Sequence, residues 1–345
     1  MMCVHFEERM ARLILHHARI RRRQECLRAC QDGEINAQQV VQTIELQTRF
    51  GIHGLEQAKT RAQSDMNAAM CGGFFLWTAG DESWFFPKFE NFSAPWVLFG
   101  RGFYEKSMFS ARRVCVVGSR AASKSGMALA HACAMRLVQR GFCIVSGGAV
   151  GIDAAAHAGA LHARGMTWVF FGSGISRPYP ERNLALFRDV TARGGMLFSA
   201  GMAHPPDRAF FVQRNAFMAA SSKAVVVVEA RSGSGSLHTA RFALSFGRPV
   251  FVFAGSPGCN LLLAQGAIAV RDPVELAERV EVEANMKHEA TAVATHGSAG
   301  DLPEEIAART GNTLTEVLQQ LQIGELNGDA VRLPGGRWLL LHHRE

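Results

Sequence analysis

Three segments rich in glycine and serine carry the residues of this sequence that could hold an anion. In the first, an apolar run at 114–117 leads directly into Gly118, Ser119 and Arg120. Gly118 permits a tight turn, Ser119 offers a hydroxyl group and Arg120 offers a forked cation. When such a loop opens a helix, its backbone N–H groups lie at the positive end of the helix dipole, where a phosphate oxygen binds well.

The other two segments also follow apolar runs. The run 142–145 precedes a loop that contains Ser146, Gly147 and Gly148, whose backbone N–H groups are expected to be uncovered. Further along the loop, Gly151 lets the chain bend before Asp153. The run 224–228 precedes a loop and helix that contain Ser234, Gly235, Ser236 and Thr239. Each loop alone is a weak signal, because a tight strand-to-helix turn favours glycine anyway. Three loops at one sheet edge predict a phosphate-binding groove.

Unbroken apolar runs indicate the scaffold that would bring these loops together. Further runs of this kind, ending in small residues, lie at 168–174, 196–201, 224–230, 249–255 and 267–270. Because they are continuously apolar rather than alternating, they are typical of strands covered on both faces by helices. The pattern predicts an α/β protein with one doubly wound, mostly parallel sheet of at least six strands.

Changes in composition and hydrophobic pattern along the chain indicate four regions. Residues 1–70 read as a small helical domain, 71–280 as the sheet domain, 281–300 as a polar linker and 301–345 as a winged helix. Within the sheet domain, 71–113 form an aromatic lead-in. It is interpreted as a plug covering one edge of the sheet, and exposed rings that stack on bases are the alternative.

Composition sets broad limits. The 345 residues contain 37 Lys and Arg against 30 Asp and Glu, and this modest basic excess permits a polyanionic partner without requiring one. No apolar run is long enough to cross a membrane and the start does not resemble a signal peptide, so a cytoplasmic protein is expected. The eight cysteines are scattered, as expected for reduced core residues rather than disulfides.

Several single residues allow two interpretations. Arg120 contacts a phosphate or pairs with a neighbouring acid, and Asp153 is expected to act as an N-cap that orders its loop. His157, four residues later, could hydrogen-bond Asp153 or the loop. A catalytic acid–base pair of His157 and Asp153 is not favoured, because no serine, cysteine or second carboxylate is placed with them as the third catalytic residue. Glu229 could be a hydrolase carboxylate, although bracing an adjacent serine–glycine loop or pairing with an arginine is favoured.

In the N-terminal region two features are interpreted as structural rather than as binding sites. One is a basic cluster of four arginines, Arg19, Arg21, Arg22 and Arg23. It is expected to be a solvated helix face rather than a nucleic-acid contact. Cys26 and Cys30, with His16 and His17 upstream, lack the spacing of a zinc site, so no metal is expected. No other cofactor is expected either.

Taken in order, the motifs resemble the DNA-processing protein A family, DprA, also called Smf. The resemblance runs from about residue 74 to 276 and includes PWVLFGRG (95–102), VGSR (117–120), SGGAVGIDAAAHAGAL (146–161) and VVEARSGSGSLHTA (227–240). It implies a Rossmann-like core, with the tail similar to the winged helix of many members. It also implies a binding protein rather than an enzyme: a dimer that holds single-stranded DNA and helps load the RecA recombinase during natural transformation.

Carried over onto this sequence, the resemblance assigns DNA-phosphate contacts to the three loops named above and adds Arg214 and Asn215, which match an RN pair. Three positions depart from the family pattern, namely Val150, Ala200 and Ala216, and the loss of two candidate donors among them is expected to weaken phosphate contacts. Two other functions stay open. One is an enzyme that acts on nucleoside phosphates, and the other is a sensor that binds a small nucleotide.

Overall fold

The computed structural model describes residues 2–285 apart from 22, 32, 79, 80, 82 and 88–93. Beyond residue 285 it describes 303–304, 307, 313–314, 316–318, 320–321, 330–332 and 338–340.

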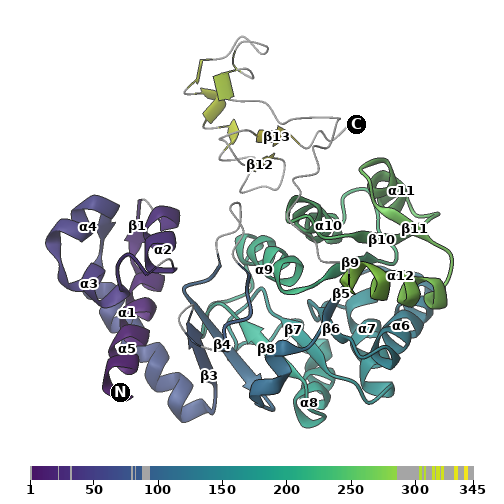
Figure 1. Ribbon diagram of the computed structural model, residues 1–345, viewed down its shortest axis with the longest axis horizontal. Helices are drawn as coiled ribbons and strands as arrows, with labels where there is room; N and C mark the ends of the chain where they lie inside the picture. Colours follow the sequence, from purple (N-terminus) through teal and green to yellow (C-terminus); the bar gives the residue numbers. More distant parts are fainter. Residues whose placement is uncertain are drawn as a thin grey trace.

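The N-terminal region is helical, as predicted, and is drawn in purple in Figure 1. Its helices are α1 (Met2–His17), α2 (Arg23–Gln31), α3 (Ala37–Gln42), α4 (Ile44–Phe50) and α5 (Leu55–Gly72). The helix expected across the basic cluster is wrong, because Arg19–Ile20 form a short strand, β1, that pairs antiparallel with β2 (Ile52–His53). Arg19 and Arg21 are exposed there on a strand and a turn, and Arg22 lies outside the described residues.

Among the described residues, nine strands form one sheet, and the order across it is β11-β10-β9-β5-β6-β7-β8-β4-β3. Its strands are β3 (Phe75–Thr78), β4 (Val97–Gly102), β5 (Arg113–Val117), β6 (Cys143–Ser146), β7 (Thr167–Phe170), β8 (Met196–Ser199), β9 (Ala224–Val227), β10 (Val250–Phe253) and β11 (Ile268–Val270). From β11 to β8 all neighbours are parallel, while β4 joins β8, and β3 joins β4, in antiparallel pairs. The predicted mostly parallel sheet is confirmed.

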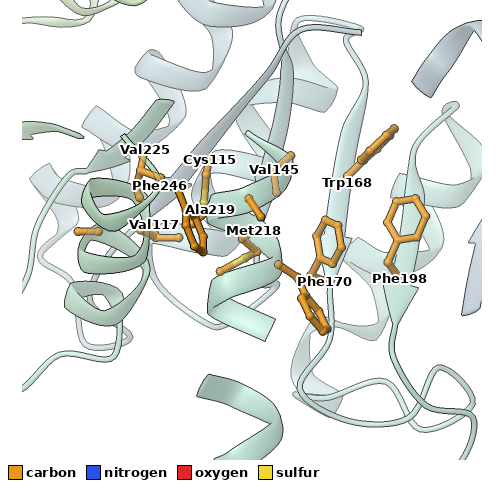
Figure 2. Close-up of a cluster of buried hydrophobic side chains, with 14 of the residues drawn as sticks. Cys115, Val117, Val145, Trp168, Phe170, Phe198, Met218, Ala219, Val225 and Phe246 are labelled. Atoms are coloured by element: carbon orange, nitrogen blue, oxygen red, sulfur yellow. The ribbon is translucent and has the colours of Figure 1, made fainter. Parts of the chain in front are cut away.

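Helices cover both faces of this sheet (Figure 1). They are α6 (Lys124–Gln139), α7 (Ile152–His162), α8 (Leu184–Ala192), α9 (Arg208–Ser221), α10 (Ser236–Ser245), α11 (Pro257–Ala264) and α12 (Pro273–Asn285), with short 3-10 helices at Lys106–Ser110 and Glu181–Asn183. Val114 and Val116 of β5 belong to the core beneath α6, α7 and α12. Cys115 and Val117 belong to the opposite core, beneath α9 and α10, which Figure 2 shows together with Met218. The alternation of β5 residues between two cores explains why the strand is apolar throughout.

The chain order around β5 creates a switch point. After β5 the chain builds β6, β7 and β8 successively to one side, then returns to build β9, β10 and β11 on the other side. β5 and β9 are therefore neighbours whose following loops diverge. In doubly wound sheets, ligands bind in the crevice at the carboxyl ends of such a pair.

The aromatic lead-in packs inward against the sheet and also contributes strands to it. Phe85 and Phe86 are buried, and the Phe85 ring lies 5.0 Å from that of Trp168 and 5.4 Å from that of Phe198. The lead-in also supplies β3 and β4, which extend the sheet. These two rings cover a face of the sheet at inner strands rather than its edge, and their burial leaves no face for a base.

The C-terminal boundaries differ in part from expectation. Helix α12 continues through Asn285, and so includes the first residues of the expected linker, while 286–300 lie outside the described residues. Ala330–Arg332 (β12) pair antiparallel with Trp338–Leu340 (β13), in agreement with the expected hairpin. The helices of the expected winged helix fall largely outside the described residues, so this domain stays a prediction. No helix in the described part of the chain has the length and apolarity needed to span a membrane.

Candidate functional site

A cavity of about 760 Å³ lies at the switch point, between the loop after β5, the loop after β9, and helices α9 and α10. Four arginines and two aspartates line it: Arg120, Arg208, Arg214 and Arg231, with Asp153 and Asp207. Of the residues predicted to bind phosphate, it is lined by Gly118, Ser119, Arg120, Asp153, Arg214, Asn215, Ser234, Gly235, Ser236 and Thr239. The sheet thus brings residues of all three predicted loops to one place, although the loop after β6 contributes only Asp153 of its predicted residues.

The loop after β5 is fixed by Glu229 on the neighbouring strand end. Its carboxylate accepts hydrogen bonds from the Ser123 backbone N–H at 3.0 Å and from the Ser123 hydroxyl at 2.5 Å, while its carbonyl oxygen accepts from the Ser119 N–H at 2.7 Å. Glu229 therefore braces the loop, which confirms the favoured interpretation. The bond from Ser119 also means that this amide donates within the protein rather than to a ligand.

In the loop after β6, the expectation of uncovered N–H groups is wrong at Gly147, whose amide donates within the protein. Ser146, Gly147 and Gly148 are buried and, like Gly151, do not line the cavity. The Asp153 carboxylate accepts hydrogen bonds from the Gly147 N–H at 3.2 Å and from the Ala149 N–H at 3.4 Å. The N-cap of α7 is Gly151 rather than Asp153. Asp153 orders its loop as expected, but in doing so it accepts a hydrogen bond from the Gly147 N–H, one of the groups that were assigned to a phosphate.

Arg214 lies inside the protein. Its guanidinium donates a hydrogen bond to the Phe170 carbonyl oxygen at 2.9 Å, and a side chain on Gly147 would overlap it. Burial lowers the pKa of Arg214, and the nearby Asp153 opposes that shift. Burial also raises the pKa of Asp153, which Arg214 in turn opposes. Each of these two groups therefore offsets part of the cost of burying the other at the inner end of the cavity.

Arg120 points outward. It is exposed, and no ion pair within the described residues includes it. Its guanidinium lies 5.3 Å from the centre of the Phe211 ring, and the Arg214 guanidinium lies 5.6 Å from the same ring. Phe211 thus holds two cations on one aromatic side chain. Sequence reasoning missed Phe211, although its position three residues before Arg214 on α9 would place both on one helix face.

The loop before α10 is held from both sides. Asn215 on α9 donates from its side-chain amide to the Gly235 carbonyl oxygen at 3.3 Å, and the Ser234 and Ser236 hydroxyl groups lie 2.8 Å apart. Gly233 and Gly235 are exposed. Arg231 at the start of this loop also lines the cavity and was missed, although it directly follows the Glu229-Ala230 pair at the strand end.

The remaining candidates lie outside the cavity. His157 is fully buried, and its Nδ1 lies 2.7 Å from the Thr167 hydroxyl, so its observed partner is on β7 and not Asp153 or the loop. Val150, Ala200 and Ala216 do not line the cavity either. His17, upstream of Cys26 and Cys30 in the sequence, lies with its Nε2 3.0 Å from the Asp65 carboxylate.

The fold and the position of the cavity define a class: Rossmann-like, doubly wound proteins that bind a ligand at the switch point of the sheet. Residues 76–281 match the family model described as DNA recombination-mediator protein A. The chain belongs to this family, and the resemblance read from the sequence is confirmed. Protein Smf of Escherichia coli is 34% identical over 267 residues, which cover 70% of this chain and 71% of Smf.

Solved structures agree with this assignment. The X-ray structure of DprA from Streptococcus pneumoniae has a TM-score of 0.61 and 26% identity, covering 79% of this chain and 95% of that one. DNA processing protein A from Helicobacter pylori, described for its single-stranded DNA binding mode, shares the fold with a TM-score of 0.54 and 24% identity, covering 61% of this chain and 96% of that one. The protein is thus a DNA-processing, recombination-mediator protein.

Proposed function

We propose that this protein binds single-stranded DNA at the switch-point cavity and, as a homodimer, helps to load RecA onto the strand during natural transformation. The observation that carries the DNA-binding part is the arginine-lined cavity, with Arg120 exposed at its edge and without an ion-pair partner among the described residues. An exposed guanidinium over an aromatic ring suits a strand that offers both phosphates and bases. The H. pylori relative, described as binding single-stranded DNA, supports the same ligand.

We also propose that the protein acts by binding rather than by catalysis. The carboxylate of Asp153 accepts two backbone hydrogen bonds, and His157 turns to Thr167 instead of toward the cavity. Neither group is arranged as a general base beside a nucleophile.

The test is a salt titration of the binding of an oligothymidylate strand, measured by fluorescence anisotropy. If Arg120 contacts one phosphate, Arg120→Ala weakens binding about tenfold and makes the slope of log affinity against log salt shallower by about 0.7. Arg188→Ala, which removes an exposed arginine of α8 outside the cavity, is the matched control and leaves both quantities unchanged. Binding that responds neither to salt nor to Arg120→Ala rejects the proposal. An equally long duplex is expected to bind more weakly.

A further inference from the structure

Two histidines meet where helices α6 and α7 pack together, on the face of the sheet opposite α9 and α10. His131 lies within α6, and His162 is the last residue of α7. The two helices lie side by side (Figure 1) and approach closely because Gly159 of α7 has no side chain. A Cβ at residue 159 would overlap the carbonyl oxygen of His131. This close approach brings together two imidazole rings that are 31 positions apart in the sequence.

The two rings face each other through nitrogen atoms. Nδ1 of His162 lies 3.4 Å from Nε2 of His131, while the ring centres are 5.3 Å apart and the ring planes meet at 66°. The distance between the nitrogens is longer than the roughly 2.7–3.2 Å at which N–H groups usually donate, so a hydrogen bond between the rings is weak. Two nitrogens that each lie about 2.0–2.1 Å from one tetrahedral zinc ion are about 3.3–3.4 Å apart. The observed separation therefore matches the spacing of two ligands of one metal ion.

The pair is also in a suitable chemical state and is accessible. Burial, together with the nearby charge of His162, lowers the pKa of His131, which favours the neutral imidazole that ligates metals. His162 is exposed, so a hydrated ion can reach the two nitrogens. None of the ion pairs in the described part of the chain includes either histidine.

We propose that His131 and His162 form a site for a divalent transition-metal ion of the zinc type, held by Nε2 of His131 and Nδ1 of His162. Imidazole suits zinc, nickel and copper, whereas magnesium and calcium prefer oxygen ligands. Among the described residues, no group of three or more His, Cys, Asp or Glu side chains could hold a metal, so water completes the coordination. The ion links α6 to α7, whose preceding loops carry Arg120 and Asp153. The site is independent of the proposed binding of DNA.

The experiment titrates Zn²⁺ into the full-length protein, in a buffer that does not chelate zinc, and measures binding by isothermal titration calorimetry. Wild-type protein is expected to bind one equivalent of Zn²⁺ that both His131→Ala and His162→Ala lose. Counting the difference from wild type separates this site from any other group that binds zinc. Mg²⁺ is expected to give no binding at this site.

His53→Ala, which removes an exposed histidine of β2, is the matched control and keeps the zinc equivalent. Thermal unfolding without metal shows whether each variant is folded, and His131→Gln and His162→Gln replace an alanine variant that is not. Equal zinc binding by wild type and by both variants overturns the site. Loss of the equivalent in only one of the two variants also overturns it, because the other histidine is then not a ligand.

Discussion

At the scale of single residues, Gly147 and Arg214 depend on each other. Arg214 lies on α9, 67 positions after Gly147 in the sequence. Its guanidinium occupies the space where a side chain on residue 147 would lie. The glycine expected to expose its backbone to a phosphate instead makes room for a buried cation. The need for glycine at this position was read correctly from the sequence, but for a different reason.

Gly147→Ala is therefore expected to displace the Arg214 guanidinium and break its hydrogen bond to Phe170. We expect the free energy of unfolding to fall by about 1–3 kcal/mol, as for other overpacked sites, and single-strand affinity to fall with it. Urea unfolding and anisotropy measure the two effects. Gly233→Ala is the control for the free energy of unfolding, because a Cβ there meets nothing within 4 Å; an equal loss of stability in the two variants contradicts this account.

At the scale of elements, the cavity depends on the junction between strands β5 and β9. Glu229 follows β9 and holds the loop that follows β5, including Ser123, the N-cap of α6. A carboxylate at a helix N-terminus also interacts favourably with the helix dipole. The loop that carries Arg120 is thus positioned by the adjacent strand rather than by its own sequence.

Glu229→Ala is expected to destabilise the protein by about 1–3 kcal/mol, because the Ser123 amide and hydroxyl lose their acceptor. Single-strand affinity should fall too, since Arg120 loses its fixed position. Glu229→Gln keeps one acceptor oxygen and should lose less stability. Chemical unfolding together with anisotropy measures both, with Glu34→Ala at an exposed site as the control. A loss of stability with unchanged DNA affinity would show that the brace does not position Arg120.

At the scale of the whole molecule, the N-terminal helices and the sheet share a hydrophobic core. Leu13 and Phe50 from the helices belong to the same buried cluster as Trp96, Phe99 and Val169 from the sheet domain. The two predicted domains are therefore in contact through apolar side chains. We expect them to stabilise each other on unfolding.

Global stability should also depend on pH through His157. Burial, together with the nearby charge of Arg214, lowers the pKa of His157 to about 3. Because histidine in the unfolded chain titrates near pH 6.5, the unfolded state binds more protons below that pH. The free energy of unfolding should fall by up to about 1.4 kcal/mol for each pH unit below about 6.5.

Urea unfolding at about pH 7 and about pH 5.5 measures this slope. His157→Gln should flatten it, whereas His53→Gln, at an exposed position, should not. Asp153 acts in the opposite sense: its raised pKa makes stability fall as pH rises above about 3.9, the value in unfolded chains. Comparison of the two histidine variants removes that contribution, and an unchanged slope in His157→Gln would refute the assignment.

The sequence by itself determined the sheet, its covered strands and the loops that follow them. Continuous apolar runs such as 224–227 cannot be solvated, so they must lie between helices, and parallel strands place their following loops at one edge. The motif order was also sufficient for the family, because it depends on residue identity and spacing alone.

Only the tertiary structure decided which of the expected binding groups are available. The Gly147 and Ala149 amides are consumed by Asp153, Arg214 bonds to a carbonyl of β7, and Phe211 gathers two guanidinium groups. The physical reason is that a polar group binds whichever partner lies nearest in space. For Arg214 and Phe170 that partner is 44 residues away in the sequence, a distance over which spacing carries no information.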